Sequence, residues 1–310
     1  MSASPLVSLV MPVWKPRRDW LVQAVRAALA QVDVRVELIV IDDGNEAPVE
    51  GLLSDIDDER LRVVRIEHGG SSAARNAGLA VAAGSFMRFV DADDVCPPDS
   101  TSRLLARAIA HPGSIAYGAV THCDEHLRPR WTMTCELQGD VLLDCLLGRL
   151  TVGIQALLFP HRVVAAAGPW DASFAVSEDW EWVLRTLEHA PVAGGRQRVY
   201  LYRRHAGGAT TNVEQGAAGG RRIVTAFFDR HPDLRGTRAA RQAEALLLAR
   251  SSRIQISHGR PGAAIAPAIR SILRDPVLLV EEAARYVPAA RAIARRRLAP
   301  ARKEIHVDHA

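Results

Sequence analysis

The first ninety residues alternate short apolar runs with segments of helical spacing, and no other feature constrains the fold as strongly. Runs rich in Val, Ile and Leu predict four buried strands, at 6–13, 36–41, 61–66 and 85–90. The segments between them predict helices at 19–30, 46–56 and 71–83, the last with Ser71 or Ser72 as N-cap. Strands that alternate with helices form βαβ units. We therefore expect an α/β fold with a mixed, mostly parallel sheet and helices on both faces.

The pattern changes after residue 94. It predicts helices at 97–110, 139–147 and 178–188, and strands at 114–121, 130–135, 154–159 and 199–203. Five glycines then indicate a flexible stretch, at positions 207, 208, 216, 219 and 220. From about residue 221 onward the pattern is helical and is broken only at prolines. We expect an α/β domain over 1–215, with parts at about 1–94 and 95–215, and a helical C-terminal extension over 216–310.

Charge also differs between these two regions. Residues 1–215 carry 21 basic and 27 acidic side chains, whereas residues 216–310 carry 18 and 8. An acidic front half disfavours nucleic acid as a partner. The end of the chain gathers basic residues around Val287, Ile293 and Leu298, namely Arg291, Arg295, Arg296, Arg297, Arg302 and Lys303. This tail predicts a helix lying peripherally on an anionic membrane. The alternative is a solvated extension or a homodimer contact.

Targeting and redox signals are weak in this sequence. The chain starts directly with a strand-like segment, and no apolar run approaches the length needed to span a bilayer. The cytoplasm, including the inner face of the membrane, is therefore the expected location. The four cysteines form no C-x-x-C pair and are expected to be buried thiols, at positions 96, 123, 135 and 145.

Acidic residues gather where the predicted strands end. The second strand runs into Asp42-Asp43-Gly44-Asn45, and the fourth runs into Asp91-Ala92-Asp93-Asp94. Ligands of open α/β sheets bind beyond the carboxyl ends of the strands. Three carboxylates within four residues repel one another unless a cation compensates them, and Mg²⁺ and Mn²⁺ prefer such oxygen ligands. The alternative is an acidic turn that caps the following helix.

Five segments, taken in order, resemble the family 2 glycosyltransferases. They are Val7–Trp14, Ile39–Asn45, Gly69–Leu79, Phe89–Asp94 and Ser177–Arg185, and the resemblance covers about residues 6–210. It implies the GT-A fold, with a nucleotide-binding part at about 1–94 and an acceptor-binding part at about 95–215. It also implies transfer with inversion. The Q-x-x-R-W segment and the membrane helices of processive relatives are absent from the sequence, which favours non-processive transfer.

The resemblance assigns the nucleotide-binding residues. Pro12, Val13 and Trp14 would adjoin the nucleobase, with Trp14 in place of the common Tyr. Asp42 and Asp43 would face the nucleoside, the alternative being an Asx turn. Arg75, in Ala74-Arg75-Asn76-Ala77-Gly78, would contact the nucleotide or pair with the aspartates. Asp91 and Ala92 complete the set.

The resemblance also assigns metal ligands and a catalytic base. Asp93 is the firmest expected ligand of Mn²⁺ or Mg²⁺, with Asp91 and His205 as further ligands. Asp179 is the expected general base and Glu178 its alternative, at the start of the helix over 178–188. The non-catalytic alternative is simple capping of that helix by Ser177. Trp180 and Trp182 are expected either in an acceptor platform or in the core.

Together these features predict a metal-dependent inverting glycosyltransferase. Its donor would be a nucleoside-diphosphate sugar, with a UDP-sugar favoured. Its acceptor would be a saccharide or a lipid-linked acceptor in the synthesis of cell-surface polysaccharide, glycolipid or glycoconjugate. Two alternatives are a nucleotidyltransferase of related fold and a non-catalytic scaffold protein. A nucleotidyltransferase would need a lysine- or glycine-rich phosphate loop near the first strand, where Lys15 is the only lysine.

Overall fold

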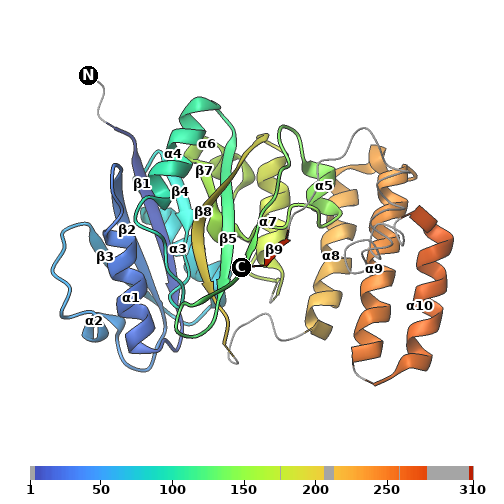
Figure 1. Cartoon of the computed structure of the whole chain (residues 1–310), viewed down its shortest axis with the longest axis horizontal. Helices are drawn as coiled ribbons and strands as arrows, with labels where there is room; N and C mark the ends of the chain where they lie inside the picture. The colour runs from blue at the N-terminus through green and yellow to red at the C-terminus, as the bar shows by residue number, and fades with distance from the viewer. Residues whose placement is uncertain (1–3, 175, 206–212, 258, 278–306, 310) are drawn as a thin grey trace. The chain divides into compact units, whose positions relative to one another are not determined.

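The computed structural model describes residues 4–174, 176–205, 213–257, 259–277 and 307–309 (Figure 1). By their contacts these residues form two units, which are described separately. The first comprises the described residues of 1–142, 150–208 and 305–310, and the second those of 143–149 and 209–304.

One mixed sheet forms the centre of the first unit. Its N-terminal strands pair in parallel in the order β3-β2-β1-β4. They are β1 (Leu6–Val13), β2 (Arg35–Asp43), β3 (Leu61–Ile66) and β4 (Phe86–Phe89). The sheet continues from β4 as β7-β5-β6-β9, with β8 beside β5. These strands are β5 (Ile115–Cys123), β6 (Pro129–Met133), β7 (Leu157–Pro160), β8 (Val192–Arg203) and β9 (Val307–His309). Antiparallel pairing of β7 with β4 and β5 makes the sheet mixed, as the sequence predicts.

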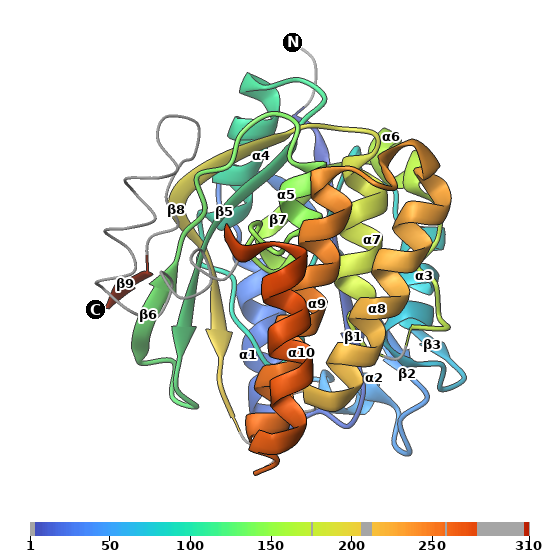
Figure 2. The same ribbon diagram turned by 90° about the vertical axis from the view of Figure 1, so that its right-hand side faces the viewer.

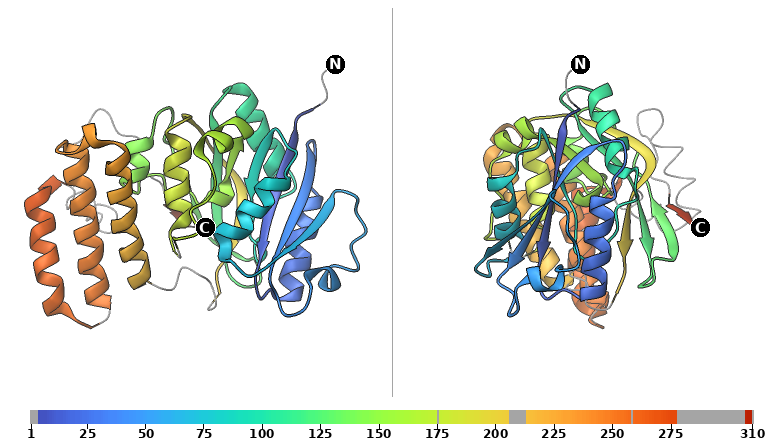
Figure 3. Two further views of the ribbon diagram at one scale, coloured as in Figure 1. Left: turned by 180° about the vertical axis from the view of Figure 1, so that it is seen from behind. Right: turned by 90° about the vertical axis from the view of Figure 1, so that its left-hand side faces the viewer.

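Helices cover both faces of this sheet. Figure 1 shows α1 in front of the N-terminal strands, and the left panel of Figure 3, seen from behind, shows α3 in front of them. The helices of this unit include α1 (Arg18–Leu29), α3 (Gly70–Val81), α4 (Ser100–Ala110), α6 (His161–Ala167) and α7 (Glu178–Leu187). Because both faces are covered, the strands β1, β2, β4, β5 and β7 are buried along most of their length, and Leu9, Ile39 and Val40 are 0% exposed. The predicted α/β fold is confirmed.

The second unit is helical. Its main elements are α8 (Val213–Arg230), the 3₁₀ turn η3 (Pro232–Leu234), α9 (Arg238–Ser257) and α10 (Pro261–Arg274). Helix α9 packs against both α8 and α10 (Figure 2). Gly216, Gly219 and Gly220 lie inside α8, so the prediction of a flexible stretch at these positions is wrong. Gly207 and Gly208, the other two glycines of that prediction, lie outside the described residues. The basic tail predicted to contact a membrane, residues 291–303, lies outside the described residues.

Several predicted elements are shorter than expected. Within 46–56 only α2 (Val49–Leu52) is helical, because Pro48 disfavours helical backbone at the residue before it. Within 139–147 only α5 (Leu142–Leu146) is helical. Gly139 has a φ of 75° and exchanges backbone hydrogen bonds with Val192 instead. The predicted strand at 154–159 begins as the 3₁₀ turn η1 (Ile154–Ala156) and becomes extended only in β7.

Strand β8 starts seven residues before the predicted strand at 199–203, at Val192. Gly194 and Gly195 weaken its sequence pattern, but at Gly194 the glycine is required. A Cβ there would lie 2.2 Å from Cζ of Tyr117 on β5. Close approach of the two backbones therefore accounts for a glycine within a strand.

Two other sequence predictions concern burial and membrane crossing. All four cysteines are buried, as expected. Among the described residues, no helix has both the length and the apolar character to cross a bilayer.

A buried arginine joins the strand ahead of the acidic turn to three other segments. Arg88 on β4 is 0% exposed. Its guanidinium donates to the hydroxyl groups of Ser100 (2.9 Å) and Thr101 (2.8 Å) at the start of α4. It also donates to the carbonyl groups of Val199 on β8 (2.6 Å) and Gln155 (3.2 Å). This residue therefore fixes β4, and with it the position of Asp91–Asp94, against the rest of the sheet.

Replacing Arg88 with Met should lower the free energy of unfolding by about 3 kcal/mol or more, because several buried acceptors lose a charged donor. Urea denaturation measures this change. The matched control is Arg103→Met on the same helix that Arg88 contacts, since the side-chain contact of Arg103 among the described residues is an exposed ion pair with Asp99. That control should change stability by less than about 1 kcal/mol. Equal effects of the two substitutions would contradict the structural role of Arg88.

Candidate active site

The carboxyl ends of β1, β2 and β4 lie at one edge of the sheet, because these strands are parallel neighbours. Val13 is paired with Asp42 across β1 and β2. Strand β4 lies on the other side of β1 and leads into Asp91. The order β3-β2-β1-β4 reverses its direction at β1, which is the position where α/β sheets leave a crevice for a ligand. The predicted nucleotide and metal residues therefore converge.

Asp42 holds the loop after β2 in place. Its carboxylate accepts hydrogen bonds from the Asn45 side chain (2.7 Å) and backbone (3.0 Å), and from the Val49 backbone (3.1 Å). It also pairs with Arg65 (3.2 Å). Burial by itself would raise the pKa of Asp42, yet these bonds hold it below its usual value. Asp42 therefore orders its own loop, as the alternative left open for it supposes, although its bond to the Asn45 backbone reaches three residues on and not the two of an Asx turn.

Asp43, the last residue of β2, caps the start of helix α3, which follows β3. Its two carboxylate oxygens accept from the backbone N–H groups of Gly69 (2.8 Å) and Gly70 (3.0 Å), where α3 begins. The prediction of Ser71 or Ser72 as N-cap is therefore wrong, because the N-cap is Gly69 and the cap comes from another strand. A carboxylate at this end also matches the positive pole of the helix.

Trp14 and His68 form an aromatic pair beside this loop. Their ring centroids are 3.8 Å apart and the rings are nearly parallel. His68 Nδ1 lies 2.9 Å from a carboxylate oxygen of Asp43, and Trp14 keeps 44% of its surface exposed. No role for His68 was expected from the sequence, because an isolated histidine has no local pattern. The neighbouring Pro12 is partly exposed and Val13 is buried, so Trp14 is the residue of this segment that offers an open aromatic surface.

The three aspartates of the acidic turn have different surroundings. Asp91 accepts from the Gln155 side-chain amide, and its backbone N–H donates to the Tyr200 hydroxyl (2.9 Å). Burial raises the pKa of Asp91 to about 6, with Arg75 opposing this rise and Asp93 adding to it. Ala92 lies between Asp91 and Asp93 in the sequence and is partly exposed.

Asp93 is the most open of the three, with a side chain that is 41% exposed. One of its oxygens lies 2.9 Å from Nε2 of His205, so the structure brings together the firmest predicted metal ligand and the predicted histidine. His205 also contacts Trp20 edge-on, with ring centroids 4.8 Å apart. Within the described residues, no three His, Cys, Asp or Glu side chains converge into a ready-made metal cage.

Asp94 is 2% exposed and belongs to the support of the site. It accepts from the Arg203 backbone N–H (2.6 Å), and burial raises its pKa well above the usual value. The Arg203 guanidinium donates to the carbonyl groups of Asp93 and Glu125 and to the Gln23 side chain. A cleft of about 530 Å³ is lined by Arg203, α1 and the turn after β5, and its lining includes none of the acidic-turn residues.

Arg75 connects two of the acidic groups. Its guanidinium donates to Glu178 (2.9 Å) and lies 3.9 Å from Asp91. It stacks over the Trp170 ring at 4.5 Å and is only 6% exposed. The sequence left two alternatives for Arg75, contact with the nucleotide or pairing with acidic side chains. Both stay open, because Arg75 pairs with acidic side chains and also lies where the phosphates of a nucleotide would need a fixed cation.

Glu178 and Asp179 have different partners. Glu178 is engaged by Arg75 and by the Ser71 hydroxyl (2.7 Å). Asp179 accepts only a local bond from the Trp180 backbone (2.8 Å) among the contacts described. Burial raises the pKa of Asp179, with Glu178 adding to the rise and Arg75 opposing it. Ser177 is in the left-handed region at φ 61° and makes no side-chain cap bond, so simple helix capping does not account for this segment.

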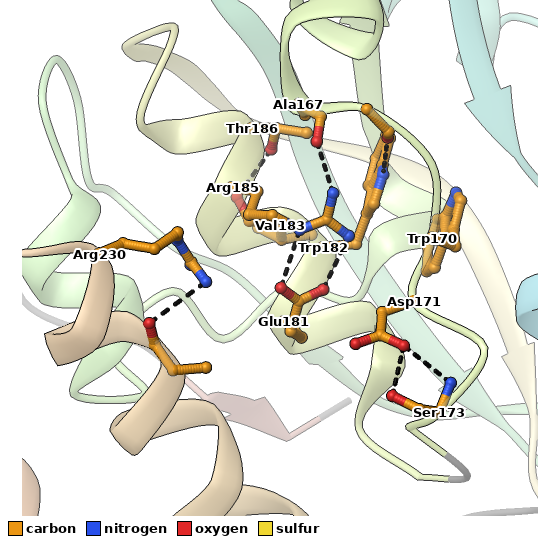
Figure 4. Close-up of polar contacts among 12 residues, drawn as sticks. Ala167, Trp170, Asp171, Ser173, Glu181, Trp182, Val183, Arg185, Thr186 and Arg230 are labelled. Carbon is orange, nitrogen blue, oxygen red and sulfur yellow. Dashed lines mark hydrogen bonds and ion pairs between the residues drawn. The ribbon is translucent and has the colours of Figure 1, made fainter.

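Helix α7 is fixed from its buried side. Figure 4 shows the Arg185 guanidinium held between the Glu181 carboxylate and the carbonyl group of Ala167. Trp182 is 0% exposed and stacks on Trp170 at 4.5 Å, so it belongs to the core and is not an acceptor platform. This packing places the N-terminal end of α7 where Glu178 meets Arg75.

The sequence model of glycosyl transferase family 2 matches residues 8–176. The chain belongs to glycosyl transferase family 2. This membership decides between the predicted glycosyltransferase and its two alternatives, the nucleotidyltransferase and the scaffold protein, in favour of the glycosyltransferase.

Individual relatives cover parts of this protein. The succinoglycan biosynthesis protein ExoO of Rhizobium meliloti is 37% identical over 99 residues, which span 32% of this chain and 28% of that protein. The glycosyltransferase GlyG of Streptococcus pneumoniae is 30% identical over 126 residues, 39% of this chain and 41% of that protein. The chain thus spans less than half the length of these curated relatives.

A solved structure resembles nearly the whole chain. TarS 1–349 of S. aureus, crystallised in complex with UDP-GlcNAc, superposes with a TM-score of 0.59. The match covers 88% of this chain and 90% of that one at 16% identity, so it shows the fold.

Close packing of α3 on β1 fixes the position of Arg75, and Gly78 permits it. A Cβ on Gly78 would lie 2.3 Å from a methyl carbon of Val10. Helix propensity alone would make Gly78→Ala stabilising by about 1 kcal/mol. We expect the opposite, a loss of about 1–3 kcal/mol in the free energy of unfolding, because the core around Val10 becomes overpacked.

Denaturant unfolding of the two single variants and the double variant tests this packing. Val10→Ala makes room for the new methyl group, so Val10→Ala/Gly78→Ala should lose less stability than the sum of the single losses. Additive losses would show that the two residues are not in steric conflict.

Proposed function

We propose that this enzyme transfers a sugar from a nucleoside-diphosphate sugar to an acceptor hydroxyl with inversion, in a metal-dependent reaction. The supporting observation is the convergence of Asp91, Arg75 and Glu178–Asp179 at one edge of the parallel strands. The UDP-GlcNAc complex of the TarS neighbour favours a UDP-sugar as donor. The succinoglycan relative favours a role in polysaccharide synthesis.

The donor nucleotide would lie over the ends of β1 and β2. Trp14 offers an aromatic surface to a base beside His68, and Asp43 holds the loop that carries His68. Asp42 would contribute indirectly, by ordering the loop after β2, because its oxygens already accept hydrogen bonds from Asn45 and Val49. Arg75 contributes a fixed positive charge toward the diphosphate.

The donor set fits Mn²⁺ or Mg²⁺. Asp93 supplies an open carboxylate and His205 lies against it. Asp91 lies two residues earlier in the sequence, and a neighbouring cation would lower its pKa. So few protein ligands leave positions for water and diphosphate oxygens, as Mg²⁺ prefers. When bound, the metal would supply Lewis-acid stabilisation of the charge on the departing diphosphate.

Asp179 would act as the general base. The acceptor oxygen forms a bond to the anomeric carbon, the bond from that carbon to the diphosphate oxygen breaks, and Asp179 receives the hydroxyl proton. Its raised pKa makes it a stronger base than an ordinary aspartate. Glu178 would position Arg75, with which it forms a 2.9 Å ion pair.

The cytoplasmic location, the homodimer and the membrane contact of residues 291–303 stay predictions.

Thermal denaturation tests the metal–nucleotide site. UDP-, GDP- and dTDP-sugars are compared with and without Mn²⁺, and the cognate donor should raise the melting temperature more when the metal is present. Asp93→Ala should remove the metal-dependent part of this rise. The control is Asp55→Ala, which changes an exposed aspartate whose described ion pair is with Arg18 on the surface. Full retention of the rise in Asp93→Ala would exclude Asp93 as a ligand.

Transfer assays by mass spectrometry test the base. Asp179→Asn should keep donor binding and lose about 10²–10⁴-fold in kcat, the usual range for general-base assistance. Glu178→Gln should mainly raise the donor KM, because it weakens the contact with Arg75. If Glu178→Gln abolishes kcat while Asp179→Asn does not, the two roles are exchanged.

A further inference from the structure

Helix α10 has its large apolar side chains on the outside. Nine large apolar side chains are exposed among the described residues, and four of them lie on this one helix. These four residues, the α10 apolar face, are Ile265 (59% exposed), Ile269 (51%), Ile272 (44%) and Leu273 (78%). Their spacing of four, three and one residues places them on one side of the helix.

The opposite side of α10 is small and polar, and this is the side that is buried. Ser271 donates to the carbonyl group of Ala245 on α9 (2.8 Å), and Ser252 of α9 donates to the carbonyl group of Ala264 (2.9 Å). Ala264 is 4% exposed and Ser271 is 1% exposed. A helix on the surface of a globular protein normally buries its aliphatic residues and exposes its polar ones. Helix α10 does the reverse while firmly attached to α9 (Figure 2).

The charges around the α10 apolar face indicate the sign of the charge that its partner carries. Residues 261–274 contain two arginines and no acidic residue. Arg270 and Arg274 are exposed beside Leu273. Together with Arg221 and Glu244 they line a groove of about 610 Å³, in which Arg274 pairs with Glu244 (3.1 Å). Over residues 209–277 the chain carries 11 basic and 5 acidic side chains. The partner that this surface fits is therefore anionic as well as apolar.

Two partners within the protein itself do not meet this requirement. A second copy that docked through the same face would bring an equally basic α10 against the first. The segment 278–306 carries seven basic and three acidic residues, so it too is basic. An aliphatic stripe flanked by arginines matches an anionic lipid surface, whose acyl chains receive the aliphatic groups and whose headgroups attract the arginines.

We propose that α10 is a membrane-docking helix that inserts Ile265, Ile269, Ile272 and Leu273 into the interface of an anionic bilayer. The inference concerns binding and does not depend on the sugar that the enzyme transfers. It also differs from the predicted contact through residues 291–303, since it assigns the docking surface to a helix whose packing is described.

Co-sedimentation with vesicles tests the proposal on the full-length chain. Vesicles of equal parts phosphatidylcholine and phosphatidylglycerol should bind the protein, vesicles of phosphatidylcholine alone should bind it more weakly, and added salt should weaken binding to the anionic vesicles. Ile269→Glu/Leu273→Glu should reduce the partition coefficient by at least about tenfold, because one buried aliphatic side chain is worth on the order of that factor. Arg270→Glu should reduce it on anionic vesicles only.

The matched control is Ile109→Glu on α4, which changes a side chain that is 55% exposed, and it should bind as the wild type does. Because all the substituted side chains are exposed, melting temperatures should stay close to that of the wild type, which shows that each variant is folded. The proposal fails if the wild type binds neither kind of vesicle. It also fails if the α10 double variant binds as tightly as Ile109→Glu. A wild-type dimer that this double variant dissociates, without vesicle binding by either, would assign the face to a second copy instead.

Discussion

The ion pair between Arg75 and Glu178 is the contact on which the candidate site depends. Glu178 lies 103 positions from Arg75 along the chain, yet the two side chains meet at 2.9 Å. Arg75 also lies within 3.9 Å of Asp91, so one nearly buried cation links α3, the acidic turn and the start of α7. If Arg75 lost one of these partners, its buried charge would be left uncompensated, which is unfavourable. Because Arg75 must stay close to both carboxylates, it fixes the separation of the three segments.

The supports of the site are also long-range and polar. Arg88 fixes β4 through hydroxyl and carbonyl groups of α4 and β8, and Asp43 caps α3 from β2. Asn76 adds two hydrogen bonds to the Trp170 backbone, at 2.9 and 2.8 Å. Each of these contacts joins a strand end or a helix start to a segment that is distant in sequence. The open groups, Trp14 and Asp93, are held on loops whose backbone is already ordered, which suits a site that works by positioning and electrostatics.

The two units present different surfaces to a partner. In the first unit, polar and charged groups gather at the carboxyl edge of the sheet. In the second, α10 exposes aliphatic side chains flanked by arginines. If both proposals hold, one part of the chain performs the transfer and the other holds the enzyme at an anionic surface. Such an arrangement would suit an acceptor that is itself carried on a lipid.

The sequence by itself determined the α/β class, the first, third and fourth strands almost to the residue, and the acidic groups at the strand ends, because apolar periodicity is a local property. It also carried the family resemblance through short motifs. Only the tertiary structure separated the aspartates, assigning Asp42 and Asp43 to loop and helix support while leaving Asp93 open. It also engaged Glu178 with Arg75 and left Asp179 with a local bond only. These differences between the carboxylates depend on which distant donors reach each of them. The tertiary structure likewise decides whether the apolar face of a helix such as α10 is turned inward or outward. Spacing along the chain encodes neither property.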